Sequence, residues 1–522
     1  MVGYSGTGYK GMQISASEKT IEGDLFKAFV EAGAISKANA DDPKKASLMR
    51  CARTDKGVHA AGNMISLKLI LEDDDIVAKI NEHLSPQIRV WGIERTIGSF
   101  SCYQACDSRW YEYLIPSHAF LPPHPSSWLA KKLEELADAT GDREGYECRQ
   151  QEVNEFWAEA EKIYIEPVLG MIDGDLKADV IRALKGEDEA DAVASVEDVD
   201  AEQIVKIGNA TAGGAESSAT TSEKTEEAAI IIREPDPEAT KSLHIEPRDL
   251  SMVDEAQNAG RSIDTATTAP EDLERLLRLR AATKQLRQAY IAAKRRHRIP
   301  ASRIAHIQAA LNKYVGTLNF HNYTVQKTFN DPSAKRHIKS FVVNPKPILI
   351  GADEAESEKS EWLSLKVHGQ SFMMHQIRKM VGMITLLVRC GASLSTLDDS
   401  LTASRYSIPK VPGLGLLLER PVFDSYNELT APKHGREKLD FGKFEKELLE
   451  FKEREIYQRI FREEEERNEF AKFFNHVDNF KDAHFLWVTS GGANAVKDAQ
   501  GDKATGAPTR RGSDMYEDDV EL

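Results

Sequence analysis

Residues 50–63 read RCARTDKGVHAAGN and set one carboxylate, that of Asp55, among cations. Arg53 lies two residues before Asp55, and Lys56 and Gly57 follow it directly. A free aspartate has a pKa near ~4, and adjacent cations favour its charged form. Gly57 permits a turn that lets another group approach the backbone closely. The pattern predicts an ionised carboxylate on a tight turn, and a solvated turn with local ion pairs is the alternative interpretation.

The chain has 522 residues, which favours two or three domains over a single core. It has no run of 18 apolar residues and no signal-peptide pattern, so we expect an intracellular protein without membrane contact. The first strand is expected to begin almost at Met1, which suggests a shortened N-terminus. Five scattered cysteines favour a reducing compartment over a disulfide scaffold: Cys51, Cys102, Cys106, Cys148 and Cys390.

The net charge of −16 is distributed unevenly along the chain. Residues 175–260 hold 21 acidic and 8 basic residues, whereas residues 275–303 hold ten Lys or Arg and no acid. A helix with that composition favours contact with phosphates. A nuclear-import signal or a merely solvated helix is the alternative. The average charge therefore does not exclude a polyanionic partner.

Periodicity divides the chain into α/β and helical segments. Helical spacing is expected in 18–35, with Ile21, Leu25, Ala28 and Phe29 on one face, and again in 372–388. Strands are expected at 1–4, 64–71, 110–116, 338–344 and 362–372, and a charged amphipathic helix at 441–480. The predicted organisation is an α/β half at 1–120, a helical insertion at 121–174, an acidic disordered insert at 175–262, a basic helix and second α/β half at 263–425, a helical extension at 426–490 and a disordered tail at 491–522.

Three further segments carry residue types suited to ligand contact. YSGTGYKGMQ (4–13) is a glycine-rich loop, but it lacks the spacing of a nucleotide cradle. In SRWYEYLI (108–115), Tyr111 and Tyr113 share one strand face, which is either core or a surface on which bases stack; FHNYT (320–324) is similarly ambiguous. In HGQSFMMHQIRKMVG (368–382), His375 and Arg378 lie one helical turn apart.

Other chemistries find little support in the sequence. Cys102 and Cys106 are separated by three residues, but no second close pair completes a four-ligand metal site, so two core cysteines are the simpler interpretation. No nucleophile elbow is present for acyl transfer. A metal-dependent phosphohydrolase using Asp55 and His59 is disfavoured because the motif contains no other carboxylate.

Taken together and in order, five segments resemble motifs of the TruA-type tRNA pseudouridine synthase family. RTDKGVHA resembles its RTDAGVHA signature, and YSGTGYKGMQ its opening YDG…GWQ element. SRWYEYLI, FMMHQIRKMVG and VPGLGLLLERPVFD (411–424) are similar to its R-Y-x-Y-x-I, F-x-x-x-M-V-R-N-I-V-G and P-x-x-GL-x-L motifs. The resemblance covers about residues 3–120 and 310–425. The GMQ variant, the C-terminal extension and the acidic insert resemble the eukaryotic tRNA pseudouridine synthase 1 branch.

This resemblance implies an α+β fold. Two ferredoxin-like, RRM-related halves would be fused into one antiparallel sheet with helices on one face and the active cleft on the concave face. It also implies Asp55 as the catalytic residue, Tyr111 as the ring that packs on the target base and assists proton loss from C5, Arg378 as the partner of Asp55, and Arg53 as the group that holds the target nucleotide out of its helix. The sequence departs from the family at Lys56, which replaces alanine, and at Lys379, which replaces asparagine.

The implied reaction isomerises uridine to pseudouridine, with the Asp55 carboxylate acting at the ribose either as nucleophile at C1′ or as base at C2′. It needs no organic cofactor; relatives in this branch are associated with a structural zinc ion, for which the sequence shows no clear ligand set. The expected partners are tRNA and other structured RNA such as snRNA or mRNA, the expected state is a monomer rather than a dimer, and the expected location is the nucleus, with mitochondrion or cytoplasm as alternatives. A non-catalytic RNA-binding protein or tRNA chaperone of the same fold is the competing interpretation.

Overall fold

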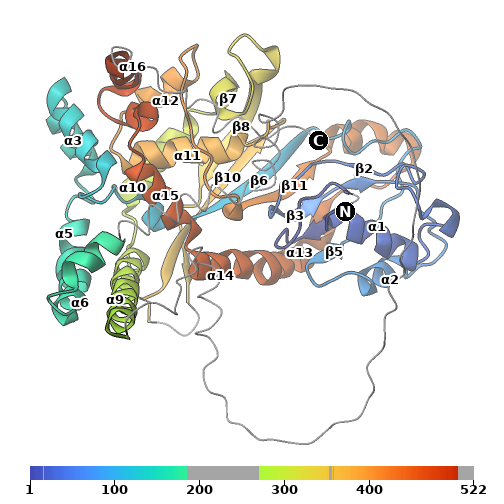
Figure 1. Ribbon diagram of the computed structural model, residues 1–522. Helices are drawn as coiled ribbons and strands as arrows, with labels where there is room; N and C mark the ends of the chain where they lie inside the picture. The colour runs from blue at the N-terminus through green and yellow to red at the C-terminus, as the bar shows by residue number, and fades with distance from the viewer. Residues whose placement is uncertain (16, 185–269, 352–354, 357, 504–522) are drawn as a thin grey trace, which may run out of the picture.

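The computed structural model describes residues 1–15, 17–184, 270–351, 355–356 and 358–503 (Figure 1). Within these residues, nine strands form one sheet in the order β5-β1-β3-β11-β6-β10-β8-β7, and β9 pairs with β10. The strands are β1 (Val2–Tyr4), β3 (His59–Asn63), β5 (Ile88–Val90), β6 (Ser108–Pro116), β7 (Gly316–Asn319), β8 (Lys335–Val343), β9 (Ile348–Ile350), β10 (Ser360–Gly369) and β11 (Leu416–Val422). A separate pair joins β2 (Met49–Arg50) and β4 (Ile65–Ser66).

Strand β6 joins the two halves of the chain. It pairs with β10 in an unbroken antiparallel register from Arg109↔Gly369 to Pro116↔Trp362, and with β11 on its other edge. The expectation of a wholly antiparallel sheet is wrong at one place, because β11 runs parallel to β3. Since β11 lies between two strands of opposite direction, it must be parallel to one of them. The sheet is therefore mixed, though mostly antiparallel.

Helices from both halves cover one face of this sheet. Thr20 caps α1 by accepting a hydrogen bond from the Gly23 amide at 3.2 Å, and Leu25 and Phe29 are buried as the helical spacing predicts. On α11 almost every residue is buried, and its last residue, Arg389, donates from Nη2 to Asp478 Oδ2 at 2.9 Å. The helices are α1 (Ile21–Glu31), α2 (Ile76–Glu82), α3 (Trp128–Thr140), α4 (Arg143–Gln150), α5 (Phe156–Ala160), α6 (Glu166–Met171), α9 (Pro270–Arg295), α10 (Ala301–Asn312), α11 (Gln376–Arg389), α12 (Ser395–Ser400), α13 (Glu445–Phe451), α14 (Gln458–Arg467), α15 (Glu469–Asn479) and α16 (Gly492–Lys503).

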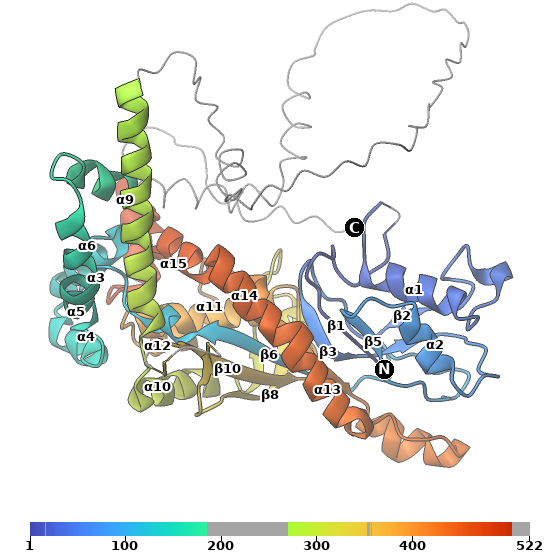
Figure 2. The ribbon, with the colours of Figure 1, turned by 90° about the horizontal axis from the view of Figure 1, so that it is seen from below.

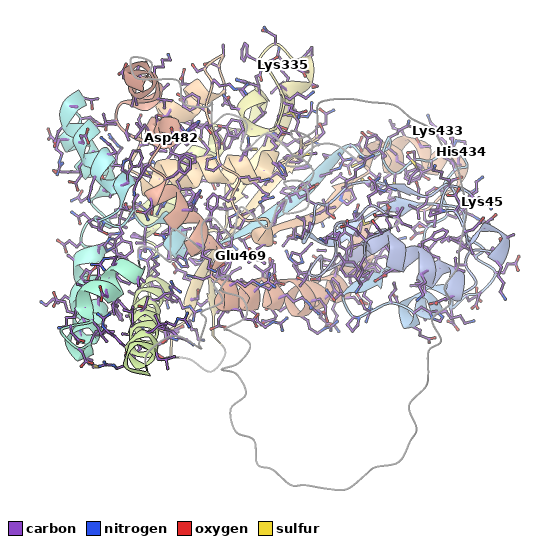
Figure 3. All side chains as sticks on the ribbon, in the orientation of Figure 1. Lys45, Lys335, Lys433, His434, Glu469 and Asp482 are labelled. Carbon is purple, nitrogen blue, oxygen red and sulfur yellow. The ribbon has the colours of Figure 1, made fainter. Side chains whose placement is uncertain are left out.

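The C-terminal extension covers the second face, so the expectation of helices on one face only is also wrong. Figure 2 shows α13 and α14 lying across the strands. The extension is one helical arm interrupted by the π-helical segment η10 (Lys452–Tyr457), and it turns at Asn468 into α15, whose first residue, Glu469, is labelled in Figure 3. Two glycines leave room for aromatic rings of the C-terminal extension. A Cβ on Gly62 would lie 2.8 Å from the ring of Phe441, and a Cβ on Gly92 would lie 2.4 Å from the ring of Phe444.

A buried ion cluster fixes the extension to the sheet. Lys452 Nζ lies 2.6 Å from Glu112 Oε2 on β6 and also contacts Glu419 on β11, while the Tyr457 hydroxyl donates to Glu112 at 2.7 Å. The side chains of Lys452 and Glu112 are only 6% and 1% exposed. Burial alone would raise the pKa of Glu112, but the charges of Lys452 and Lys366, together with hydrogen bonds to Glu419 and Lys452, outweigh burial and lower that pKa to about 2. By contacting both Glu112 and Glu419, Lys452 therefore offsets part of the free-energy cost of burying the two carboxyl groups.

Three sequence expectations need adjustment. Ordered structure extends past residue 175, because residues 177–184 are helical and Val180 is buried; the acidic segment from 185 to 262 lies outside the described residues. The tail expected to be disordered from 491 begins with α16, and Ala495 is buried. In the strand expected at 64–71 only β4 is a strand, because the Lys68 and Ile70 amides donate to loop carbonyls of Ala46 and Ala34 instead.

Within the described part of the chain, no helix is long and apolar enough to cross a bilayer.

Replacing Lys452 with methionine should destabilise the protein by about 3–5 kcal/mol, because two buried carboxylates would lose their shared cation. The measurement is the free energy of unfolding in urea at neutral pH. Lys446→Met is the matched control, since Lys446 lies six residues earlier in the extension and its side chain is 85% exposed; it should change stability by less than about 0.5 kcal/mol. Equal stability of the two variants would contradict the structural role of the cluster.

Candidate active site

Asp55 lies at the tip of the loop that joins β2 to β3. The Val58 amide closes the turn by donating to the Asp55 carbonyl at 3.1 Å, and Gly57 adopts the left-handed conformation with φ of 75°. The Asp55 side chain is 50% exposed. The predicted turn is confirmed, and its carboxylate is open to solvent on one side.

The glycine-rich loop at residues 4–13 supports the Asp55 loop. The Met12 amide donates to the Thr54 carbonyl at 3.1 Å, and the Gly57 amide donates to the Tyr9 carbonyl at 3.2 Å. A Cβ on Gly6 would lie only 2.3 Å from the Val58 carbonyl oxygen. Gly6 is thus needed for close backbone contact, a role that the sequence analysis did not assign to it.

Buried side chains hold both ends of the loop. The Thr54 hydroxyl lies 2.9 Å from the Tyr4 hydroxyl, and Asn63 Nδ2 donates to the Tyr4 hydroxyl at 3.1 Å and to the Ala52 carbonyl at 3.0 Å. His59 accepts at Nδ1 from the Gly6 amide at 3.2 Å, and burial lowers its pKa to about 3. His59 is therefore a neutral structural residue, which removes the partner that a phosphohydrolase reading of Asp55 requires.

Tyr111 reaches the site from β6, with its ring facing the helix-covered side of the sheet. It is 9% exposed, and its ring meets that of Phe372 edge-on with centroids 5.3 Å apart. Burial raises the pKa of Tyr111 above its ordinary value, and the charge of Asp55 acts in the same direction. Tyr111 is therefore a neutral phenol near Asp55. Its contact with a target base stays a prediction.

The beginning of α11 brings His375 to the site and also carries Arg378. His375 immediately precedes the helix, and its Nδ1 lies 3.7 Å from Asp55 Oδ2. Arg378 donates from Nε to the Val411 carbonyl at 2.7 Å, in the loop where the Pro412 carbonyl accepts from the Tyr113 hydroxyl at 2.6 Å. The predicted pairing of Arg378 with Asp55 stays a prediction, whereas the contact of His375 with Asp55 is one that the sequence analysis missed.

Arg53 and Lys56, on either side of Asp55, are both exposed. Their positions are compatible with contact to a large ligand that approaches the open side of the Asp55 carboxylate. The role predicted for Arg53, holding a nucleotide out of its helix, stays a prediction.

A structural zinc ion does not fit the residues that the structure describes. Cys51, Cys102 and Cys106 lie in or beside one small apolar cluster, but the described side chains include no group of three or more His, Cys, Asp or Glu arranged to hold a metal. The Cys102 thiol donates instead to the Met49 carbonyl at 3.3 Å, and the Cys106 thiol to the Ser108 carbonyl at 3.3 Å. These cysteines behave as core residues, as the simpler reading of their spacing predicts.

Comparison with known proteins decides the family. A family model described as tRNA pseudouridine synthase matches residues 310–424. The chain is 38% identical to tRNA pseudouridine synthase 1 of Schizosaccharomyces pombe over its whole length and 90% of that protein. The chain belongs to the tRNA pseudouridine synthase family. It is also 40% identical to tRNA pseudouridine synthase 1 of Yarrowia lipolytica, over 94% of the chain and 76% of that protein, and 30% identical to the tRNA pseudouridine(27/28) synthase of Saccharomyces cerevisiae, over 92% of the chain and 98% of that protein.

The matched family segment contains β10, α11 and β11, and so includes His375 and Arg378 but not Asp55. The Asp55 loop is included in the similarity to the S. pombe relative, which extends over the whole chain. Membership of the tRNA pseudouridine synthase family therefore rests on both halves that meet at the site.

Replacing Gly6 with alanine should loosen the Asp55 loop, because the new Cβ would overlap the Val58 carbonyl oxygen. The expected overpacking cost of about 1–3 kcal/mol should speed hydrogen exchange of the Gly57 and Val58 amides by roughly fivefold or more. Gly98→Ala is the control, since a Cβ there meets nothing within 4 Å and Gly98 is not in the left-handed conformation. Equal exchange of residues 51–58 in both variants would show that Gly6 does not support the loop.

Proposed function

We propose that this chain isomerises specific uridines of tRNA to pseudouridine, with the Asp55 carboxylate acting at the ribose of a uridine extruded from its helix. The observation that supports it best is the half-exposed carboxylate beside buried Tyr111 and His375, in a chain of the tRNA pseudouridine synthase family. A uridine can reach such a carboxylate only after leaving its stack, which costs a few kcal/mol.

The reaction breaks the N1–C1′ bond and forms a C5–C1′ bond. The proton lost from C5 is balanced by one gained at N1, so no redox partner or group donor takes part. Asp55 either attacks C1′ through a carboxylate oxygen or removes the C2′ proton to give a glycal, and the proposal includes both routes. Both need an ionised carboxylate, and an exposed aspartate among cations meets that requirement.

The neighbours of Asp55 take separate roles in this proposal. Tyr111 stacks on the extruded base and assists proton loss from C5, because its neutral phenol already lies near Asp55. Arg378 keeps the carboxylate charged in the substrate complex, and exposed Arg53 occupies the space that the uridine leaves in the RNA helix. The observations that support these roles are the contact of His375, just before α11, with Asp55 and the effect of the Asp55 charge on the pKa of Tyr111.

Asp55→Asn keeps the side-chain shape but removes the charge, so we expect uridine conversion to fall by at least about 10²-fold while tRNA affinity stays within about threefold. Release of tritium from C5 of labelled uridine in transcribed tRNA measures the conversion. Asp42→Asn, in the exposed loop before β2, is the control and should leave conversion unchanged.

Full conversion by Asp55→Asn would show that the aspartate is wrongly assigned. A wild-type protein that binds tRNA but converts no uridine in any transcript would support the non-catalytic RNA-binding alternative.

The basic helix α9 supplies phosphate contacts in this proposal. Figure 2 shows α9 projecting from the body of the protein, and Ala282, Leu286 and Ala293 bury one side of it against neighbouring helices. Among the cations in residues 275–303, Arg275, Arg278, Arg295 and Arg296 contact carboxylates. Arg303 is buried, where it donates to main-chain carbonyls and lies 3.8 Å from Glu152. Arg280, Lys284 and Arg287 recur at intervals of four and three residues, so they lie along one face of the helix.

Replacing Arg280, Lys284 and Arg287 together with glutamine should weaken tRNA binding and reduce the slope of log affinity against log salt by about 2, because each lost phosphate contact removes most of one unit. The control replaces Lys45, Lys433 and Lys446 together with glutamine, which changes the net charge by the same amount. Lys45 and Lys433 lie at the opposite end of the molecule from α9 (Figure 3). An equal change in slope for both triple variants would refute a specific role of α9.

A further inference from the structure

His375 has an unusual backbone conformation for its residue type. Its φ of 58° and ψ of 2° place it in the left-handed region, and the described residues contain only three other non-glycine residues with positive φ: Ser47, Gln326 and Asn468. Such a conformation costs of order 1–3 kcal/mol and persists only where the surroundings enforce it, often at functional sites. Of these four residues, His375 is the one that contacts Asp55.

The surroundings of His375 fix its conformation through four hydrogen bonds. The Met373 amide donates to Gln376 Oε1 at 2.9 Å, and the Gln376 amide donates back to the Met373 carbonyl at 3.2 Å. The Thr324 hydroxyl donates to the Met374 carbonyl at 3.0 Å, and the Lys379 amide donates to the His375 carbonyl at 3.0 Å. The predicted helix at 372–388 therefore begins only at Gln376, and the irregular turn before it directs the imidazole toward Asp55.

The contact between the two side chains is asymmetric. The His375 side chain is 8% exposed and so has little freedom to move, whereas that of Asp55 is 50% exposed. Nδ1 and Oδ2 are 3.7 Å apart, which is close enough for electrostatic attraction and slightly too far for a hydrogen bond. Contacts of this kind commonly shorten when substrate binds. The fixed partner in the pair is the imidazole, and the carboxylate is the one that must be oriented.

We infer that His375 is a positioning residue for Asp55: its imidazole holds Oδ2 so that the carboxylate keeps one orientation toward the ribose. This inference rests on the proposed function and adds to it a residue that touches Asp55 rather than the substrate. It also assigns a purpose to the left-handed turn, because a helical residue at position 375 would direct its side chain along the helix surface instead.

The test is His375→Gly, because glycine accepts the left-handed backbone without strain and leaves a cavity the size of the lost imidazole. We expect the single-turnover rate of uridine conversion in tRNA to fall about 10–100-fold, as a displaced reacting group would cause, while the dissociation constant for tRNA stays within about twofold. Added imidazole should restore the rate without altering tRNA affinity, which no general loss of stability would allow. Gln326→Gly, at an exposed left-handed position, is the matched control and should convert uridine at the wild-type rate.

The remaining outcomes separate the two proposals. If the wild type converts uridine and His375→Gly converts it equally fast, the positioning role is refuted and the proposed function stands. If the rate falls but imidazole restores none of it, or if the loss lies wholly in tRNA affinity, the positioning role is likewise refuted. If the wild type itself converts no uridine, the proposed function is refuted, and the positioning role that rests on it is refuted with it.

Discussion

The hydrogen-bond ladder between β6 and β10 is the constraint on which the rest of the structure depends. It joins strands from two halves of the chain over eight residue pairs without a register shift. Because side chains alternate along a strand, this register places Tyr111 opposite Val367 on the helix-covered face and Glu112 opposite Lys366 on the other. A slip by one residue would exchange the two faces, removing Tyr111 from the Asp55 site and Glu112 from Lys452 at once. One register thus fixes both the site and the attachment of the C-terminal extension.

The second face of the sheet shows why the extension is part of the fold rather than an appendage. Two strands of the site-bearing sheet, β6 and β11, carry the carboxylates of Glu112 and Glu419 at places where the extension excludes water. Unpaired, these charges would cost several kcal/mol each. Lys452 from the extension contacts both, and Lys366 of β10 adds a second cation 3.4 Å from Glu419. Glu463 of α14 accepts from the Thr7 hydroxyl at 2.7 Å in the loop that supports Asp55. The extension therefore stabilises, from behind, the elements that form the site in front.

Sequence periodicity predicted those elements whose pattern is decided locally. Residues 18–35, 110–116 and 338–344 became α1, β6 and β8 with small changes at their ends, because the spacing of apolar residues reports the buried face. Periodicity failed where the hydrogen-bonding partner of a segment, rather than the pattern of the segment itself, determines its structure. The alternation at 64–71 is real, since Leu67 and Leu69 are half-buried, but the bonding partners are loop carbonyls rather than a strand. The parallel pairing of β3 and β11 and the π-helical interruptions of the extension have no local signal.

The site divides in the same way. Motif resemblance selected Asp55, Tyr111, Arg378 and Arg53, and in the structure burial and, to a smaller extent, the charge of Asp55 raise the pKa of Tyr111. Motif resemblance could not select His375 for a role, since the left-handed turn before the helix depends on a hydrogen bond from Thr324, a residue distant in the sequence, and on the side chain of Gln376, and apolar spacing reports neither contact. Likewise the glycines of residues 4–13 resembled a family motif without showing that Gly6 faces the Val58 carbonyl. Contacts between segments distant in sequence determine how the predicted residues are used.

The distribution of exposure around Asp55 bears on when the site becomes reactive. Tyr111 and His375 are nearly inaccessible and rigidly held, while the carboxylate keeps half of its surface in water. In that state water weakens every electrostatic interaction of Asp55, including the attraction to His375 across 3.7 Å. An extruded uridine would displace this water, and the same charges would then act in a medium of lower dielectric constant, where they are stronger. Under the proposed function, His375 would orient the carboxylate in advance and the RNA would supply the final enclosure, so that the energy spent on extruding the base would also complete the site.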